Sequence, residues 1–212
     1  MEQLIILSLI AGGINLDTRA AFQFMISRPI ISGPVIGYFL GELEFGLMAG
    51  IFLELLWINV IPMGAAIPPE TSLSGMLAVS LAIMCDRPSL EGAFILAILY
   101  AVLCSSVFRW SDITLRRLNT YWAHFLDRKM ERGGLSWVDA VIYFGVITVF
   151  LQGAVLFYLL VRTGLFLINN IPPSPWLEEA LKHVYSYFPA MGLGIVFSAF
   201  WVKPEKYPFL GK

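Results

Sequence analysis

Residues 22–70 read FQFMISRPIISGPVIGYFLGELEFGLMAGIFLELLWINVIPMGAAIPPE, and this stretch decides the fold class. It holds two apolar segments, 29–41 and 45–61, which glycine and proline interrupt repeatedly. Each is shorter than the roughly 20 residues that a straight helix needs to cross a bilayer. Broken or re-entrant helices have this pattern, and they are tolerated at membrane depth where protein or a water-filled cavity satisfies their backbone groups. We therefore expect membrane-embedded helices that are broken within this stretch.

The composition of the whole chain also favours a membrane. Of its 212 residues, 58% are hydrophobic and 14% are charged, and the mean hydropathy is +0.77. A soluble core of this length does not hide so much apolar surface. Apolar segments lie at about 3–16, 29–41, 45–61, 72–85, 91–108, 137–161 and 186–202. The predicted fold class is all-α, a polytopic integral membrane protein with about seven apolar segments in a single domain, 1–212.

A polar stretch, 109–136, separates the motif-bearing helices of 1–108 from the C-terminal spans and tail of 137–212. It carries six lysines and arginines against three acidic residues, and its apolar residues recur at helical spacing. This pattern predicts an amphipathic helix on the membrane surface. The positive-inside rule places that helix in the cytoplasm. The loop 162–185 then faces outside, with a short interfacial helix expected at about 177–187.

Two rows of glycine four residues apart mark the segments on either side of the Gly-Glu-Leu-Glu turn at 41–44. The first row is Gly33, Gly37 and Gly41, and the second is Gly46 and Gly50. Residues at this spacing share one face of a helix. Small residues on such a face let helices approach closely in lipid. We expect these rows to pack helices together, and we expect the same surfaces to slide if the helices move.

Glu54 continues the second row and has three apolar residues on each side. An acidic side chain in such a run costs a few kcal/mol to bury unless it is paired, protonated or facing water. One interpretation is a structural carboxylate that caps a broken helix or pairs with Arg19 or Arg28. The other is a ligand-binding carboxylate in a polar cavity, since a carboxylate accepts hydrogen bonds from adjacent sugar hydroxyls.

The segment 62–70, PMGAAIPPE, is incompatible with a regular helix, although apolar segments bracket it. Its prolines remove backbone donors and Gly64 loosens the chain. The segment is typical of a helix break near a binding site, where small side chains let a ligand meet the backbone, or else of an ordinary surface loop. Glu70, Thr71 and Ser72 offer caps for the helix that follows.

The segment 22–29 is the third polar element of the stretch. Ser27 is suited to cap a helix, and Pro29 fits the first helical turn. Gln23 and Arg28 bring polar groups to membrane depth or close to it. Arg28 either extends to the lipid headgroups, which we favour, or contacts a substrate.

Covalent chemistry finds no support in the sequence. The residues His124 and His183 are isolated and have no metal-ligand spacing, and Cys85 and Cys104 lie in apolar runs without disulfide or metal spacing. No nucleophile elbow or phosphate-binding loop is present. A net charge of −1 gives no indication of a nucleic-acid partner. We therefore expect no cofactor, no metal and no catalytic residue in this chain, which by itself is not an enzyme.

Several of these motifs together resemble one family. They are Phe22-Gln23-Phe24 with Ser27-Arg28-Pro29, the Gly41-Glu42 turn, Glu54-Leu55, and Gly64-Ala65-Ala66 with Pro69-Glu70. In this combination the chain resembles the IIC subunits of the mannose/fructose/sorbose family of the phosphotransferase system (PTS). The resemblance is strong over about 15–85 and general elsewhere, where it rests on hydropathy and the basic loop.

The resemblance implies a multi-pass protein of the bacterial cytoplasmic membrane that binds and translocates a hexose-like sugar. It also implies an oligomeric complex in which a IID membrane subunit completes the permease, while IIA and IIB phosphocarriers phosphorylate the sugar at the expense of phosphoenolpyruvate. Carried over residue by residue, the substrate-binding positions are Gln23, Glu54 and Glu70, with Ala65 and Ala66 in the small-residue loop.

The sequence departs from the family pattern at several points. The turn is Gly41-Glu42 where Gly-Asp is common, and Pro62 stands where an asparagine often precedes the small-residue loop. The C-terminal end is shorter than in the family pattern. These differences motivate an alternative, a regulatory or assembly subunit derived from IIC that does not transport efficiently.

Overall fold

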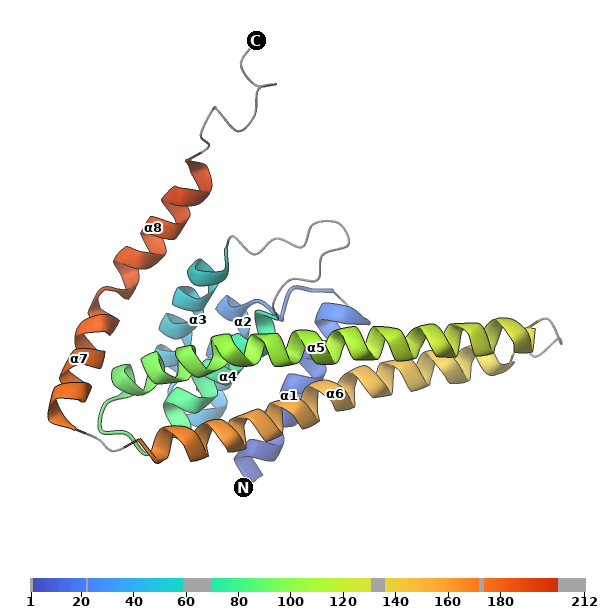
Figure 1. The fold of residues 1–212 in the computed structure, drawn as a ribbon, viewed down its shortest axis with the longest axis horizontal. Coiled ribbons are helices and arrows are strands. Elements are labelled where there is room, and N and C mark those ends of the chain that lie inside the picture. The colour runs from blue at the N-terminus through green and yellow to red at the C-terminus, as the bar shows by residue number, and fades with distance from the viewer. Residues whose placement is uncertain (1, 22, 59–69, 131–135, 172–173, 202–212) are drawn as a thin grey trace, which may run out of the picture.

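The computed structural model describes residues 2–21, 23–58, 70–130, 136–171 and 174–201. Within these ranges the chain forms eight α-helices and no β-strand (Figure 1). The helices are α1 (Glu2–Arg19), α2 (Pro29–Leu40), α3 (Leu43–Trp57), α4 (Ser72–Met84), α5 (Leu90–Met130), α6 (Ser136–Asn169), α7 (Pro175–Ser186) and α8 (Phe188–Phe200). The all-α prediction is confirmed. Each predicted apolar segment overlaps one helix, and α7 corresponds to the short helix expected at 177–187.

The helices differ in whether they are long enough to cross a bilayer. Among the described residues, two are long and apolar enough, at Leu90–Arg128 and Trp137–Asn169. Other helices are apolar but shorter, and α2 has only 12 residues. It rises about 18 Å, against a hydrocarbon core of about 30 Å. The expectation of short apolar segments is confirmed, while the number of membrane crossings stays a prediction.

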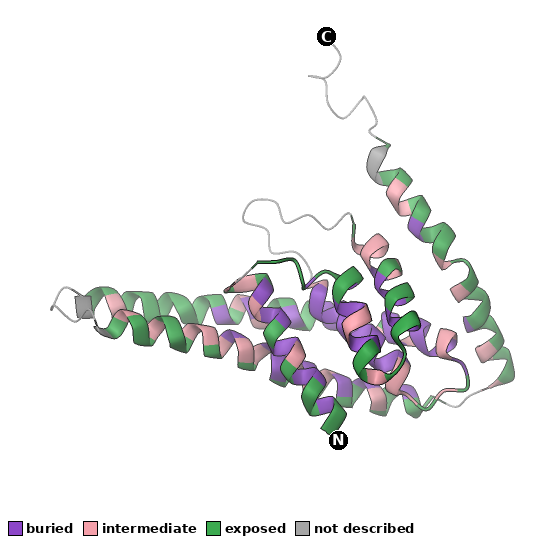
Figure 2. Ribbon diagram, turned by 180° about the vertical axis from the view of Figure 1, so that it is seen from behind, coloured by how far each residue is buried: buried purple, intermediate pink, exposed green. Residues whose placement is uncertain are grey.

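The core is built around α4, in which eleven of the 13 residues are buried. Small residues make this possible, because serine, glycine and alanine let neighbouring helices contact α4 on all sides. The surrounding helices bury one face each. In α1 that face includes Leu4, Leu7, Ala11 and Ile14, which recur every three or four residues. Figure 2 shows the buried residues concentrated where α1 to α4 meet the N-terminal half of α5 and the C-terminal half of α6.

The glycine rows pack α2 against α3, as the sequence predicted. Gly41 ends α2 with a φ of 85°, in the left-handed region that glycine favours. A Cβ atom added to Gly37 would lie 2.6 Å from the carbonyl oxygen of Glu42 and 2.9 Å from the Cα atom of Gly46. One added to Gly33 would lie 2.9 Å from the Cα atom of Gly50. The two backbones are therefore in contact along the hairpin, and the packing interpretation is confirmed.

The layout around residue 109 differs from the prediction. The amphipathic helix expected as a separate surface element over 109–136 is the second half of α5, which runs unbroken through 41 residues. No proline or glycine stands between 93 and 132 to break it. Its apolar face contacts α6, since the ring centroids of Trp122 and Phe144 lie 4.9 Å apart and those of Phe125 and Trp137 5.9 Å apart. Figure 1 shows α5 and α6 side by side as a long arm.

The last two helices leave the body at the opposite end from the tip of this arm (Figure 1). Glu178 anchors α7, because its carboxylate accepts hydrogen bonds from Arg87 and from the Ser89 hydroxyl, both at 2.9 Å. The ring of Phe188 contacts that of Phe52 on α3, with centroids 6.0 Å apart. One turn further Gly192 packs against Leu55 of α3, and the large apolar side chains of α8 are largely exposed.

Candidate functional site

The turn between α1 and α2 is held by the buried carboxylate of Asp17. Its Oδ1 atom accepts a hydrogen bond from the Phe24 N–H at 2.7 Å, and Oδ2 accepts one from the Ser27 N–H at 3.3 Å. Asp17 is 5% exposed, so these bonds replace the water that its carboxylate loses on burial. Asp17 therefore positions the turn that carries Gln23 and Arg28.

The backbone of this turn is strained at two residues. Gln23 has a φ of 54° and Met25 one of 62°, and neither is glycine. The left-handed region costs an L-residue roughly 1–2 kcal/mol, because Cβ approaches the carbonyl oxygen. Such strain persists where surrounding contacts determine the conformation, as the Asp17 bonds do here. The side chain of Gln23 is exposed, and its predicted role in substrate binding stays a prediction.

Glu54 pairs with Arg28, which is one of the two partners that the sequence left open. The Nη2 atom of Arg28 contacts the Oε1 atom of Glu54. The side chain of Glu54 is 16% exposed and that of Arg28 is 56% exposed. The pair joins the start of α2 to the last turn of α3, where a Cβ on Gly50 would lie 2.5 Å from the Pro29 carbonyl oxygen. Arg28 thus has a protein partner and is also half-exposed, and the predicted contact with lipid headgroups stays a prediction.

Glu70 pairs with Arg19 in a second, more deeply buried contact. The Nη2 atom of Arg19 lies 2.7 Å from the Oε2 atom of Glu70, and their side chains are 10% and 11% exposed. The other oxygen, Oε1, accepts a hydrogen bond from the Ser72 N–H at 3.2 Å. Glu70 therefore caps the first turn of α4, as the sequence suggested, and also joins α4 to the end of α1.

Arg19 extends this network to the long arm. Its Nε atom lies 3.5 Å from Oδ1 of Asp112 on α5, and Oδ2 of Asp112 lies 3.0 Å from Nε of Arg116. On α6, Gln152 donates a hydrogen bond to the Ser111 hydroxyl at 2.8 Å. Arg19 is consequently shared between the carboxylate of Glu70, just before α4, and that of Asp112 on α5.

Sequence reasoning did not single out Asp17, Asp112 or Gln152. Asp17 follows the first apolar segment, and Gln152 interrupts the sixth. Gln152 carries the same signal as Glu54, because both are polar groups in an apolar run. Asp112 carries no such signal, because it lies in a stretch where polar residues are common.

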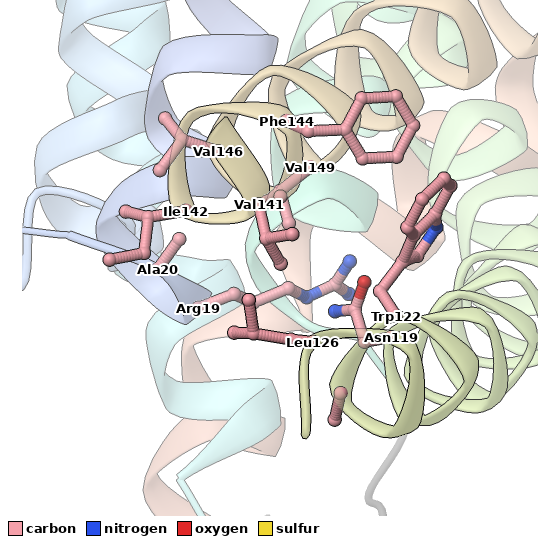
Figure 3. Close-up of a pocket in the computed structure, with 12 residues that line it drawn as sticks. Arg19, Ala20, Asn119, Trp122, Leu126, Val141, Ile142, Phe144, Val146 and Val149 are labelled. Carbon is pink, nitrogen blue, oxygen red and sulfur yellow. The ribbon is translucent and has the colours of Figure 1, made fainter. Parts of the chain in front are cut away.

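A cavity of about 350 Å³ opens beside Arg19, between the end of α1 and the distal halves of α5 and α6 (Figure 3). Its wall is mostly apolar, and Figure 3 shows Arg19 and Asn119 reaching toward each other beside Trp122. A second cavity, of about 360 Å³, lies beside Asp17 and is lined by apolar residues of α1 and of the turn that follows. The predicted residues Gln23, Glu54 and Glu70 line neither of these two cavities.

The structure thus brings two of the predicted residues, Glu54 and Glu70, to helix ends, each bound to an arginine. Ala65 and Ala66 lie outside the described residues, so their predicted role is not tested. Within the described part of the chain, no group of three histidine, cysteine, aspartate or glutamate side chains is arranged to hold a metal ion.

Comparison with known proteins extends these observations to the whole chain. The model of the family described as "PTS system sorbose-specific iic component" matches residues 1–211. The chain is 25% identical over 135 residues to the fructose permease IIC component of Bacillus subtilis, and 28% identical over 130 residues to the mannose-specific EIIC component of Escherichia coli. These alignments cover 64% and 61% of this chain, but 48% and 46% of the relatives. The chain therefore spans about half the length of the curated relatives it matches.

Solved structures show the same fold at lower identity. One chain of the cryo-EM structure of the mannose transporter ManYZ with microcin E492 matches with a TM-score of 0.62 at 19% identity. Another, described as a membrane protein, matches with a TM-score of 0.67 at 20% identity. Each alignment covers 98% of this chain and 82% of the solved chain. The helical arrangement is thus shared with membrane proteins of known structure.

Proposed function

This chain belongs to the sorbose-specific IIC family of the phosphotransferase system, and from this premise we propose that it is the sugar-conducting subunit of a permease. IIC components are transport subunits rather than enzymes, and the relatives named above carry names of fructose and mannose systems. The substrate we propose is a hexose-like sugar. The chain would bind it from outside the cell and pass it inward.

The observation that carries this proposal is the meeting of four helix ends at two ion pairs, of which Arg19–Glu70 is the more buried. The C-terminal ends of α1 and α3 and the N-terminal ends of α2 and α4 carry Arg19, Glu54, Arg28 and Glu70. Helices as short as α2 end at membrane depth if they lie along the bilayer normal. Interrupted helices of this kind surround the substrate in many transporters, and carboxylates suit a ligand rich in hydroxyl groups.

The partners that we propose follow from the family. A IID membrane subunit would complete the permease, and IIA and IIB phosphocarriers would phosphorylate the sugar with phosphoenolpyruvate as the ultimate donor. The exposed apolar side chains of α8 and of the arm are compatible with lipid and with a membrane subunit as neighbours. The location proposed is the bacterial cytoplasmic membrane.

The mechanism that we propose is alternating access, in which one packed unit moves against another around a fixed site. The α2–α3 hairpin is a suitable moving unit, because its glycines hold it together as one body. The charged pair Arg28–Glu54 lies within this unit, and the Asp17 bonds hold the turn that precedes it. The Arg19–Glu70 pair belongs to the opposing unit.

Uptake by the assembled complex tests this function. The chain would be expressed with its IID and phosphocarrier partners in a host that lacks mannose-type uptake, and accumulation of labelled mannose, fructose and sorbose would be measured. We expect phosphoenolpyruvate-dependent accumulation of at least one sugar as its phosphate. An assembled, membrane-inserted complex that binds and accumulates none of them would contradict the proposal and favour a regulatory or assembly role.

A further inference from the structure

The last turn of α3 holds two buried polar atoms that have no hydrogen-bond partner within the described structure. They are the Oε2 atom of Glu54 and the indole Nε1 atom of Trp57. The first accepts hydrogen bonds and the second donates one. Leaving a buried polar group unpaired costs roughly 1–3 kcal/mol, so nearly all such groups in folded proteins are satisfied. Two unpaired groups on one helical turn therefore need an explanation.

The two side chains lie on one face of the helix. Residues three apart on an α-helix are neighbours, with Cβ atoms roughly 5–6 Å apart. The Oε1 atom of Glu54 is occupied by Arg28, which leaves Oε2 as the open acceptor. Trp57 packs its ring against the hydrophobic core, so its orientation is constrained as well. The turn thus carries one open acceptor and one open donor on residues three apart.

The chemistry of this pair selects its ligand. An anion would be repelled by the carboxylate of Glu54, and a cation would meet the indole N–H of Trp57 and the nearby guanidinium of Arg28. A neutral group that donates and accepts at the same time satisfies both atoms, and an alcohol hydroxyl does this with a single oxygen. Such an oxygen, about 2.8 Å from each atom, would bridge them.

We propose that Trp57 is a specificity-determining residue, and that Trp57 Nε1 and Glu54 Oε2 together bind one particular hydroxyl of the transported sugar. This inference rests on the proposed function and adds to it a residue and a mode of recognition. The hydroxyl donates its hydrogen to the carboxylate and accepts the indole N–H. A sugar that lacks this hydroxyl leaves both atoms unpaired and is discriminated against.

Deoxy sugars test the assignment in the assembled complex. Binding constants for mannose, fructose and sorbose are measured first, and then those for the monodeoxy analogues of whichever sugar binds most tightly. In the wild-type complex we expect one analogue to bind at least about tenfold more weakly than its parent. Trp57→Phe keeps an aromatic ring but removes the donor, and we expect it to reduce that one penalty to about threefold or less. Trp176→Phe, at an exposed position on α7, is the matched control. It should leave the affinity losses of all the deoxy analogues unchanged.

Thermal unfolding without sugar gives a second readout. Trp57→Phe also removes part of a ring that packs against the core, so some loss of melting temperature is expected, and the melt serves to show that the variant is folded. The inference is overturned if all deoxy penalties are the same in a folded Trp57→Phe complex and in wild type. A wild-type complex that binds no sugar would instead overturn the proposed function, and this inference with it.

Discussion

The arginine partners of Glu54 and Glu70 differ in their exposure to solvent. Arg28 is 56% exposed and keeps much of its hydration when Glu54 is neutralised, whereas Arg19 is 10% exposed and depends on its protein partners. We therefore expect removal of Glu54 to perturb the fold little, and removal of Arg19 to leave the carboxylate of Glu70 without its cation. The first residue suits a test of binding and the second a test of stability.

Glu54→Gln should weaken sugar binding more than it perturbs assembly. The substitution removes a charged acceptor, and hydrogen bonds to charged groups contribute roughly 1.5–3 kcal/mol, or about tenfold and more in affinity. Sugar affinity and the yield of complex with the IID partner are to be measured in parallel. Glu179→Gln, at an exposed position on α7, is the matched control. Equal affinity in the Glu54 variant and the parent would count against a role for Glu54 in the sugar site.

Arg19→Ala should lower the free energy of unfolding by about 3 kcal/mol, because it leaves the carboxylate of Glu70 without a cation and leaves Asp112 with the exposed Arg116 alone. Thermal unfolding of the detergent-solubilised protein measures the effect. Arg117→Ala removes an exposed arginine of α5 and should have little effect. If the Arg19→Ala and Arg117→Ala variants have the same melting temperature, the Arg19 network does not stabilise the fold.

At the scale of elements, the α2–α3 hairpin depends on glycine for its contact distance. Cβ atoms on Gly37 and Gly50 would come within 2.6 and 2.5 Å of carbonyl oxygens. Backbone atoms cannot move aside as flexible side chains do, so any side chain separates the two helices.

Each of the substitutions Gly37→Leu and Gly50→Leu should therefore abolish uptake. We expect a loss of transport and of assembled complex, measured as labelled-sugar accumulation and as recovery with the partner subunit. Gly194→Leu is the bulky control, because a Cβ atom there would meet nothing within 4 Å. Normal uptake by the Gly37→Leu and Gly50→Leu complexes would show that close packing of the hairpin is not required.

At the scale of the molecule, the arm of α5 and α6 is the largest departure from the expected layout. The basic half of α5 continues the same helix as its apolar half and does not form a separate element. The arm is joined to the candidate site through Asp112 and Arg19, so the two regions share an ion-pair network. In the proposed complex the arm would extend toward the phosphocarrier proteins on the cytoplasmic side.

Spin labels at positions 103 and 121 test the continuity of α5. Both side chains are exposed, at 73% and 78%, and 18 residues of straight helix separate their backbones by about 27 Å. Cys85 and Cys104 are free and would first be replaced by alanine. We expect a single distance distribution near this separation. A markedly shorter distance would show that α5 is broken, and would favour the separate surface helix that the sequence predicted.

The sequence alone determined the all-α membrane class, the approximate helix positions and the packing role of the glycine rows. Each of these depends on local composition and spacing, which can be recognised within a single segment without knowledge of its neighbours. Glu54 was recognised for the same reason, since a charge in an apolar run is conspicuous without knowledge of its neighbours. The capping role of Glu70 was equally local, because a cap contacts its own next turn.

Only the tertiary structure decided which charges meet. The choice of Arg28 for Glu54 and of Arg19 for Glu70 depends on how four helix ends converge, and no spacing in the sequence encodes that. The same holds for Asp112 and Gln152, which approach Arg19 from different helices. In the arm, α6 contacts part of the apolar face that the sequence assigned to the membrane surface. An amphipathic face specifies that it must be buried, but its partner is chosen by the packing of the whole chain.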